Sequence, residues 1–257
     1  SYAGFRRHLE RSRFDVTVVH VAPPQRGRLA SLGPAVEFTP IAVRRSMKVV
    51  AVVNPAMPVL PHADTIDLDS AALVVELEQP LREYDVGSPT SEAVAIAGTI
   101  ANLIDDGATI QIGLGKIPDA LLSRLTSRRR LRLHSGMLSD GTRTLFEAGA
   151  LDVDHPHTSC VHVGTASYYR WLAGQQGLHV RSCDQTHAPE ILAAQTRLVA
   201  VNSAMTVDLF GAANLETLDG RAISGVGGAA DFARAASLSP EGLSIVALPA
   251  ASADGTQ

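Results

Sequence analysis

The sequence predicts an α/β protein built on mainly parallel sheets. Several short runs are apolar at nearly every position, which is typical of strands buried on both faces of a parallel sheet. Segments with helical periodicity lie between these runs, and such alternation favours the α/β class. The 257 residues, with 46% hydrophobic and 19% charged residues, are sufficient for a substantial core. Aromatic residues make up only 4%, so Val, Leu, Ile and Ala must fill that core.

Eight runs are predicted to be strands because they are short, apolar and rich in β-branched residues. They lie at residues 16–21, 48–53, 72–76, 109–112, 159–163, 178–181, 198–202 and 244–248.

Three segments are predicted to be helices. The clearest spans residues 91–105, where apolar residues recur on one face and Ser91 with Glu92 stands at the cap. Residues 118–125 open with Pro118, which suits the first turn of a helix. Residues 229–236 form a third, alanine-rich helix.

The best candidate for a domain boundary is the stretch 79–90, which has two prolines, a glycine and no periodicity. We therefore expect an N-terminal domain over residues 1–85 and a C-terminal domain over residues 91–257.

Composition excludes several functional classes. A net charge of −4 does not fit a general nucleic-acid binder. No stretch approaches the roughly 20 apolar residues of a membrane span, and the first residues lack the pattern of a signal peptide. Cys160 and Cys183 form neither a disulfide framework nor a metal-ligand spacing. We expect a soluble cytoplasmic protein without a metal.

Two glycine-containing turns are candidate ligand sites. Gly113 and Gly115 lie between a predicted strand and a predicted helix, where backbone amides can approach an anionic or carbonyl group. The third glycine of a dinucleotide fingerprint is missing, and Lys116-Ile117 lacks the hydroxyl of a phosphate-binding Gly-Lys-Ser/Thr. These residues therefore favour neither a Rossmann dehydrogenase nor a nucleoside triphosphatase.

The second turn is more specific. Gly225, Gly227 and Gly228 fall within four residues, just before the alanine-rich helix. Exposed amides at this place suit an oxyanion or a thioester carbonyl. The alternative interpretation is a flexible turn.

Two side chains are candidates for the chemistry. Glu216 lies between a predicted strand and the second glycine turn, and it is either a base or nucleophile or a solvated charge. His187 is either a base or a core or surface histidine. There is no Gly-x-Ser-x-Gly elbow and no His-x-x-x-His metal pair.

Five motifs in a fixed order resemble those of the acetyl-CoA hydrolase/transferase family, whose members include 4-hydroxybutyrate CoA-transferases. The resemblance implies two α/β domains of the CoA-transferase type, the first of them incomplete here, with acyl-CoA between them. It also implies coenzyme A as part of the substrate, a small carboxylate or other acyl acceptor, and a homo-oligomer as a possible assembly, with neither nucleic acid nor membrane as partner. The motifs are Val21-Ala-Pro-Pro24, Val52-Val-Asn-Pro-Ala-Met-Pro58, Asp106-Gly-Ala-Thr-Ile-Gln-Ile-Gly-Leu-Gly-Lys-Ile-Pro118, Val207-Asp-Leu-Phe-Gly211 and Ser224-Gly-Val-Gly-Gly-Ala-Ala-Asp-Phe232.

One departure from the family pattern bears on mechanism. Residues 133–141 read LHSGMLSDG, whereas the family's transferases have His-Ser-Glu-Met or His-Thr-Glu-Met. In those transferases the glutamate attacks the acyl-CoA and carries CoA as a thioester, and here its position is Gly136. Ala229 replaces a glutamine of the family, and His187-Ala-Pro189 corresponds to its Asn-x-Pro. Glycine has no nucleophile, so ping-pong transfer through residue 136 is chemically excluded.

Three interpretations remain, all with acyl-CoA as ligand. In the first, the protein is a hydrolase or a direct acyl transferase with His187 or Glu216 as base. In the second, Glu216 is the nucleophile and CoA transfer persists. In the third, the protein binds CoA esters without catalysis. A different class, such as a sugar-phosphate isomerase on a related scaffold, stays open because fold does not fix function.

Overall fold

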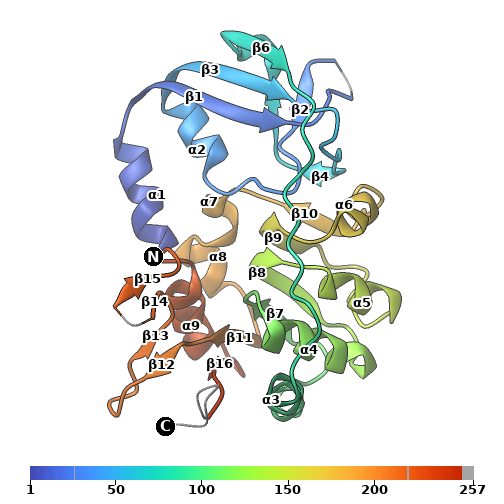
Figure 1. Cartoon of the computed structure of the whole chain (residues 1–257), viewed down its shortest axis with the longest axis vertical. Coiled ribbons are helices and arrows are strands. Elements are labelled where there is room, and N and C mark those ends of the chain that lie inside the picture. The colour runs from blue at the N-terminus through green and yellow to red at the C-terminus, as the bar shows by residue number, and fades with distance from the viewer. Residues whose placement is uncertain (26, 219, 251–257) are drawn as a thin grey trace.

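A seven-stranded, entirely parallel sheet forms the centre of the molecule (Figure 1). The computed structural model describes residues 1–25, 27–218 and 220–250. The sheet confirms the predicted α/β class. Its strands, in spatial order, are β16 (Leu243–Ala247), β11 (Leu198–Ser203), β7 (Thr109–Ile112), β8 (Arg132–Leu138), β9 (His157–His162), β10 (Leu178–Val180) and β4 (His62–Ala63).

Helices cover both faces of this sheet. On one face, α3 (Ser91–Ala101) and α4 (Lys116–Arg124) share a core with Val199 and Val201 of β11. On the other face, α8 (Pro189–Ala193) and α9 (Ala229–Leu238) pack on Leu198 and Ala200 of the same strand. Alternate residues of β11 are thus buried on opposite faces, as expected of an inner parallel strand.

The remaining elements of the larger half connect the strands. They are α5 (Gly141–Glu147), α6 (Ala166–Leu172), α7 (Cys183–Thr186), the 3-10 helix η2 (Leu125–Ser127), and two short antiparallel pairs between β11 and α9, namely β12 (Thr206–Val207) with β13 (Ala213–Asn214) and β14 (Thr217–Leu218) with β15 (Arg221–Ala222).

A second, smaller parallel sheet has the order β1 (Phe14–Val21), β3 (Ser46–Val53) and β6 (Leu73–Glu76), all from the N-terminal part of the chain. Only one face of this sheet is covered. Val16, Val18 and Leu73 lie on the uncovered face or at the edge of the sheet, where their side chains are exposed. The expectation of burial on both faces is therefore wrong for the runs 16–21 and 72–76. Around the sheet lie α1 (Tyr2–Arg11), α2 (Thr39–Arg44), η1 (Leu68–Ser70) and the antiparallel pair β2 (Leu29–Ser31) with β5 (Thr65–Asp67).

The segment between β6 and α3 is extended and runs along the larger half, as Figure 1 shows. It coincides with the predicted boundary. A single hydrophobic cluster nevertheless joins Val19 and Ala51 of the smaller sheet to Tyr168 and Val180 of the larger half. The two halves are thus packed together through a common core, and the two-domain division stays a prediction.

Two local expectations are corrected. The N-cap of α3 is Thr90, whose Oγ1 accepts a hydrogen bond from the Ala93 amide at 3.2 Å, and not Ser91 with Glu92. The central strand β8 was not among the predicted strands. Among the described residues, no helix combines the length and the hydropathy that crossing a bilayer requires.

Candidate active site

A cavity of about 440 Å³ lies at the carboxyl ends of β7, β8 and β11, where ligands of open α/β sheets commonly bind. We call it the glycine-loop cavity. Residues far apart in sequence line it: Tyr2, Gln111, Ile112, Gly113, Gly136, Met137, His187, Asn202, Ser224, Gly225, Val226, Gly227, Gly228, Ala229 and Phe232.

Most residues singled out from the sequence meet in this cavity. Gly115 does not line it but is the N-cap of α4 with a φ of 124°, a conformation that favours glycine. Glu216 does not line it either. The roles assigned to all these residues stay predictions. Those that do line it are Gly113, Gly136, His187, Gly225, Gly227 and Gly228.

The loop before α9 presents free backbone amides. In the described part of the chain, none of the amides from Gly225 to Gly228 donates a hydrogen bond. The start of the loop is fixed, since the Ser224 hydroxyl donates to the Leu215 carbonyl at 3.2 Å. Unpaired amides at a helix N-terminus carry partial positive charge and bind anionic oxygens. This loop can therefore accept a carbonyl oxygen that gains negative charge.

His187 follows α7 and lies deep in the site, with only 2% of its surface exposed. Its ring stacks on Tyr2 at a centroid distance of 4.4 Å, and Phe232 packs edge-on at 5.0 Å. Burial, with a smaller contribution from neighbouring His134, lowers the pKa of His187 to about 3. The imidazole is therefore neutral at neutral pH and can accept a proton.

The hydrogen bonds of Thr186 assign the tautomer of His187. Thr186 Oγ1 lies 2.7 Å from His187 Nδ1 and 3.3 Å from the carbonyl oxygen of Ser182. A carbonyl only accepts, so the hydroxyl donates to Ser182 and accepts from Nδ1–H. The other nitrogen, Nε2, then carries the free lone pair.

Two glycines make room for this nitrogen. A Cβ atom on Gly136 would lie 3.1 Å from His187 Nε2, and one on Gly228 would lie 2.6 Å from His187 Cδ2. Any larger residue at position 228 must displace the ring, and one at position 136 would press on it. The glycine pattern in the sequence predicts exposed amides at Gly228, and the structure adds this packing role.

A pair of amide side chains completes the wall of the cavity. Gln111 Nε2 donates to Asn202 Oδ1 at 3.2 Å, and Asn202 Nδ2 donates to Gln111 Oε1 at 3.1 Å. Both residues are buried, and each keeps one further N–H for a ligand. Gln111 was missed as a site residue, although a glutamine inside an otherwise apolar strand is a recognisable signal.

Cys160 does not line the cavity but contacts the backbone of Gly136, which does. Its thiol donates to the Gly136 carbonyl at 3.1 Å, and burial raises the pKa of the thiol. The sulfur is thus protonated and structural. In the described ranges, no group of three or more His, Cys, Asp or Glu side chains could hold a metal ion.

Comparison with known proteins gives a consistent family assignment. Residues 164–257 match the model of the acetyl-CoA hydrolase/transferase C-terminal domain. The chain is 33% identical over 247 residues to the 4-hydroxybutyrate coenzyme A transferase of Clostridium kluyveri, covering 94% of this chain and 58% of that protein. It is 26% identical to the acetyl-CoA hydrolase of Kluyveromyces lactis, over 88% of this chain and 51% of that protein.

A solved structure agrees with these relatives. The 4-hydroxybutyrate CoA-transferase of Porphyromonas gingivalis superimposes with a TM-score of 0.87 at 27% identity, over 100% of this chain and 64% of that one. The chain thus spans between about half and two thirds of the length of these similar proteins.

Proposed function

Because the chain belongs to the acetyl-CoA hydrolase/transferase family, we propose that it binds an acyl-CoA in the glycine-loop cavity and cleaves the thioester there. Cleavage occurs by hydrolysis or by direct transfer of the acyl group, without a covalent CoA intermediate at residue 136.

One observation carries this proposal: a neutral histidine and a loop with unpaired amides line the same cavity. His187 Nε2 supplies the acceptor, and the loop from Gly225 to Gly228 supplies the amides. A thioester needs both, because its carbonyl oxygen becomes negative while the attacking group loses a proton.

The reaction follows from this placement. A water molecule attacks the thioester carbon while His187 Nε2 takes one of its protons, and the amides of Gly227 and Gly228 hold the oxyanion. When the carbon–sulfur bond breaks, the imidazolium returns its proton to the departing sulfur. The products are a carboxylic acid and free CoA. In direct acyl transfer, another acceptor takes the place of water.

The low pKa of His187 is compatible with this role. The ring is in its basic form throughout the neutral range. Negative charge that develops beside it in the transition state favours the imidazolium, since an opposite charge nearby raises the pKa of a base.

A nucleophilic role for Glu216 has less support, because Glu216 is not among the residues that line the glycine-loop cavity. The two candidates are separated by a simple experiment. The rate of CoA release from butyryl-CoA is measured for the wild type, His187→Gln and Glu216→Gln. We expect His187→Gln to lose about two or more orders of magnitude in kcat and Glu216→Gln to retain activity. The reverse pattern would assign the chemistry to Glu216.

A further inference from the structure

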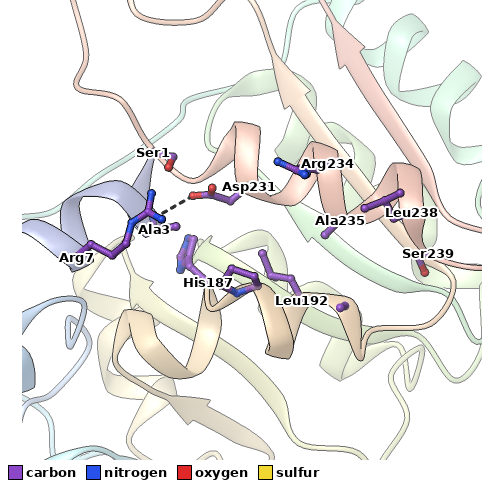
Figure 2. A pocket seen from close by; sticks show the side chains of 12 residues that line it. Ser1, Ala3, Arg7, His187, Leu192, Asp231, Arg234, Ala235, Leu238 and Ser239 are labelled. Carbon is purple, nitrogen blue, oxygen red and sulfur yellow. Dashed lines mark hydrogen bonds between the residues drawn. The ribbon is translucent and has the colours of Figure 1, made fainter.

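A second cavity, of about 580 Å³, lies between α1, α8 and α9 on another side of His187 (Figure 2). We call it the arginine-rimmed cavity. Residues in or next to these three helices line it, and its charged lining residues are Arg7, Asp231 and Arg234.

Positive side chains outnumber negative ones at this cavity. Within the described ranges, neither Arg7 nor Arg234 takes part in an ion pair. The single carboxylate present, that of Asp231, accepts a hydrogen bond from the Ala3 amide at 3.3 Å in the first turn of α1. Figure 2 shows this hydrogen bond as a dashed line that joins α1 to α9. The two guanidinium groups thus remain available to an anion from solution.

Part of the remaining lining of the cavity is apolar. Leu192 forms part of its floor, and Ala235 and Leu238 extend the apolar surface along α9. Leu238 is 75% exposed, although a large aliphatic side chain at the mouth of a cavity gains by being covered. A fitting ligand therefore combines an anionic head with a short hydrocarbon body.

His187 links this cavity to the candidate active site, since it lines both. In Figure 2 the imidazole stands at the end of the cavity nearest α1, whereas Leu238 and Ser239 lie at the other end. A ligand here would contact His187 from outside the glycine-loop cavity.

We propose that the arginine-rimmed cavity is a second ligand site, which binds a short-chain aliphatic carboxylate. Arg7 and Arg234 attract its carboxylate, and Leu192 and Leu238 cover its hydrocarbon part. The two arginines and Asp231 give the side chains that line the cavity a net charge of +1, which a single carboxylate neutralises. The site does not depend on thioester chemistry.

The test is a titration with hexanoate, followed by calorimetry and by the NMR shift of the His187 ring. We expect the double variant Arg7→Gln/Arg234→Gln to raise the dissociation constant about tenfold or more. Arg13→Gln/Arg170→Gln is the matched control, because it removes the same charge from two exposed arginines outside this cavity and should leave binding unchanged. Ala193→Phe, which fills the cavity from an exposed position, should block hexanoate in a folded protein.

One further variant locates the ligand. Gly227→Val fills the glycine-loop cavity only, so hexanoate should still bind this variant even if acyl-CoA does not. Hexanoate binding to a wild-type protein that shows no thioesterase activity would support the second site while refuting the proposed function.

Several results would overturn the inference. They are absence of hexanoate binding to the wild type, equal weakening by the two double variants, and loss of hexanoate binding in Gly227→Val. Displacement of hexanoate by 3′,5′-ADP, with dependence on Arg7 and Arg234, would instead assign the cavity to a phosphate ligand.

Discussion

At the scale of single residues, the properties of His187 are set by its neighbours. Burial keeps the ring neutral, Thr186 holds the proton on Nδ1, and glycine at positions 136 and 228 lets Nε2 reach the cavity. His187 and Gly136 were singled out from the sequence. Thr186 was not, because its role depends on a side-chain hydrogen bond that no sequence pattern encodes.

Thr186→Val should lower kcat for butyryl-CoA hydrolysis by about 10- to 100-fold, because Nδ1 loses its partner and the ring is free to change tautomer. Thr186→Ser keeps the hydroxyl and should restore most of the activity. The ¹⁵N shifts of His187 check the tautomer directly. An unchanged ¹⁵N pattern and unchanged kcat in a folded Val variant would show that Thr186 does not position the base.

Gly136→Glu should reduce the native hydrolysis rate by about tenfold or more, since its Cβ would lie 3.1 Å from His187 Nε2 and its carboxylate would enter the site. The same variant tests the prediction that residue 136 corresponds to the nucleophilic glutamate of the family. It is compared with the wild type for transfer of CoA from butyryl-CoA to acetate. Faster hydrolysis by the glutamate variant would contradict the proposed role of His187.

At the scale of elements, the junction between the glycine loop and α9 is the most informative part of the site. Gly227 and Gly228 are adjacent but face different surroundings. A Cβ at Gly227 meets no atom within 4 Å, whereas one at Gly228 collides with His187. A substitution at position 227 therefore tests ligand binding, whereas a substitution at position 228 tests packing against His187.

Gly227→Val should abolish acyl-CoA binding, because the new side chain takes up cavity space, and should change the free energy of unfolding little. Gly228→Ala should instead cost roughly 1–3 kcal/mol of stability through overpacking against His187. Chemical denaturation and butyryl-CoA titration of both variants check this contrast. Wild-type affinity in folded Gly227→Val would remove the loop from the site.

The elements also show where sequence patterns suffice. All eight predicted strands have a counterpart, because short runs rich in apolar and β-branched residues favour strands even where one face of the sheet is exposed. Strand β8 was missed because Arg132, His134 and Ser135 interrupt its apolar character. These polar residues are satisfied by tertiary bonds, such as His134 Nε2 with the Thr186 carbonyl at 2.9 Å. Helices such as α7 and α8 are too short for periodicity to reveal.

At the scale of the whole molecule, long-range pairing creates what the sequence could not show. Gln111 and Asn202 are 91 positions apart and meet only because β7 and β11 are neighbours in the sheet. The same holds for Tyr2, which reaches His187 from the first helix. Motif order revealed the family and its glycines, but the side chains that complete the cavity follow from topology.

Acid stability is a property of the whole molecule. Burial lowers the pKa of His157 to about 4 and of His162 and His187 to about 3. Since an unfolded histidine titrates near 6.5, the unfolded state binds more protons below that pH. The free energy of unfolding keeps its full value above about pH 6.5. It falls by about 1.4 kcal/mol per pH unit for each histidine as the pH decreases, down to about pH 4 for His157 and about pH 3 for His162 and His187.

His157→Asn tests this linkage, because an amide oxygen can replace the Nδ1 that accepts from the Leu133 amide at 3.3 Å. The variant should flatten the pH dependence of the unfolding free energy by about 1.4 kcal/mol per unit between pH 6 and 5. Urea denaturation at several pH values gives the slopes. Identical slopes for both proteins would mean that His157 is not held neutral.

The central claim is that thioester cleavage proceeds in the glycine-loop cavity without a covalent CoA intermediate. Its most direct test is to incubate the wild-type protein with butyryl-CoA, with and without acetate, and to follow free CoA, acetyl-CoA and protein mass together. We predict release of free CoA at a rate independent of acetate, no CoA adduct on any peptide, and loss of the reaction in His187→Gln. Rapid acetyl-CoA formation with a CoA thioester on a carboxylate such as Glu216 would contradict the claim.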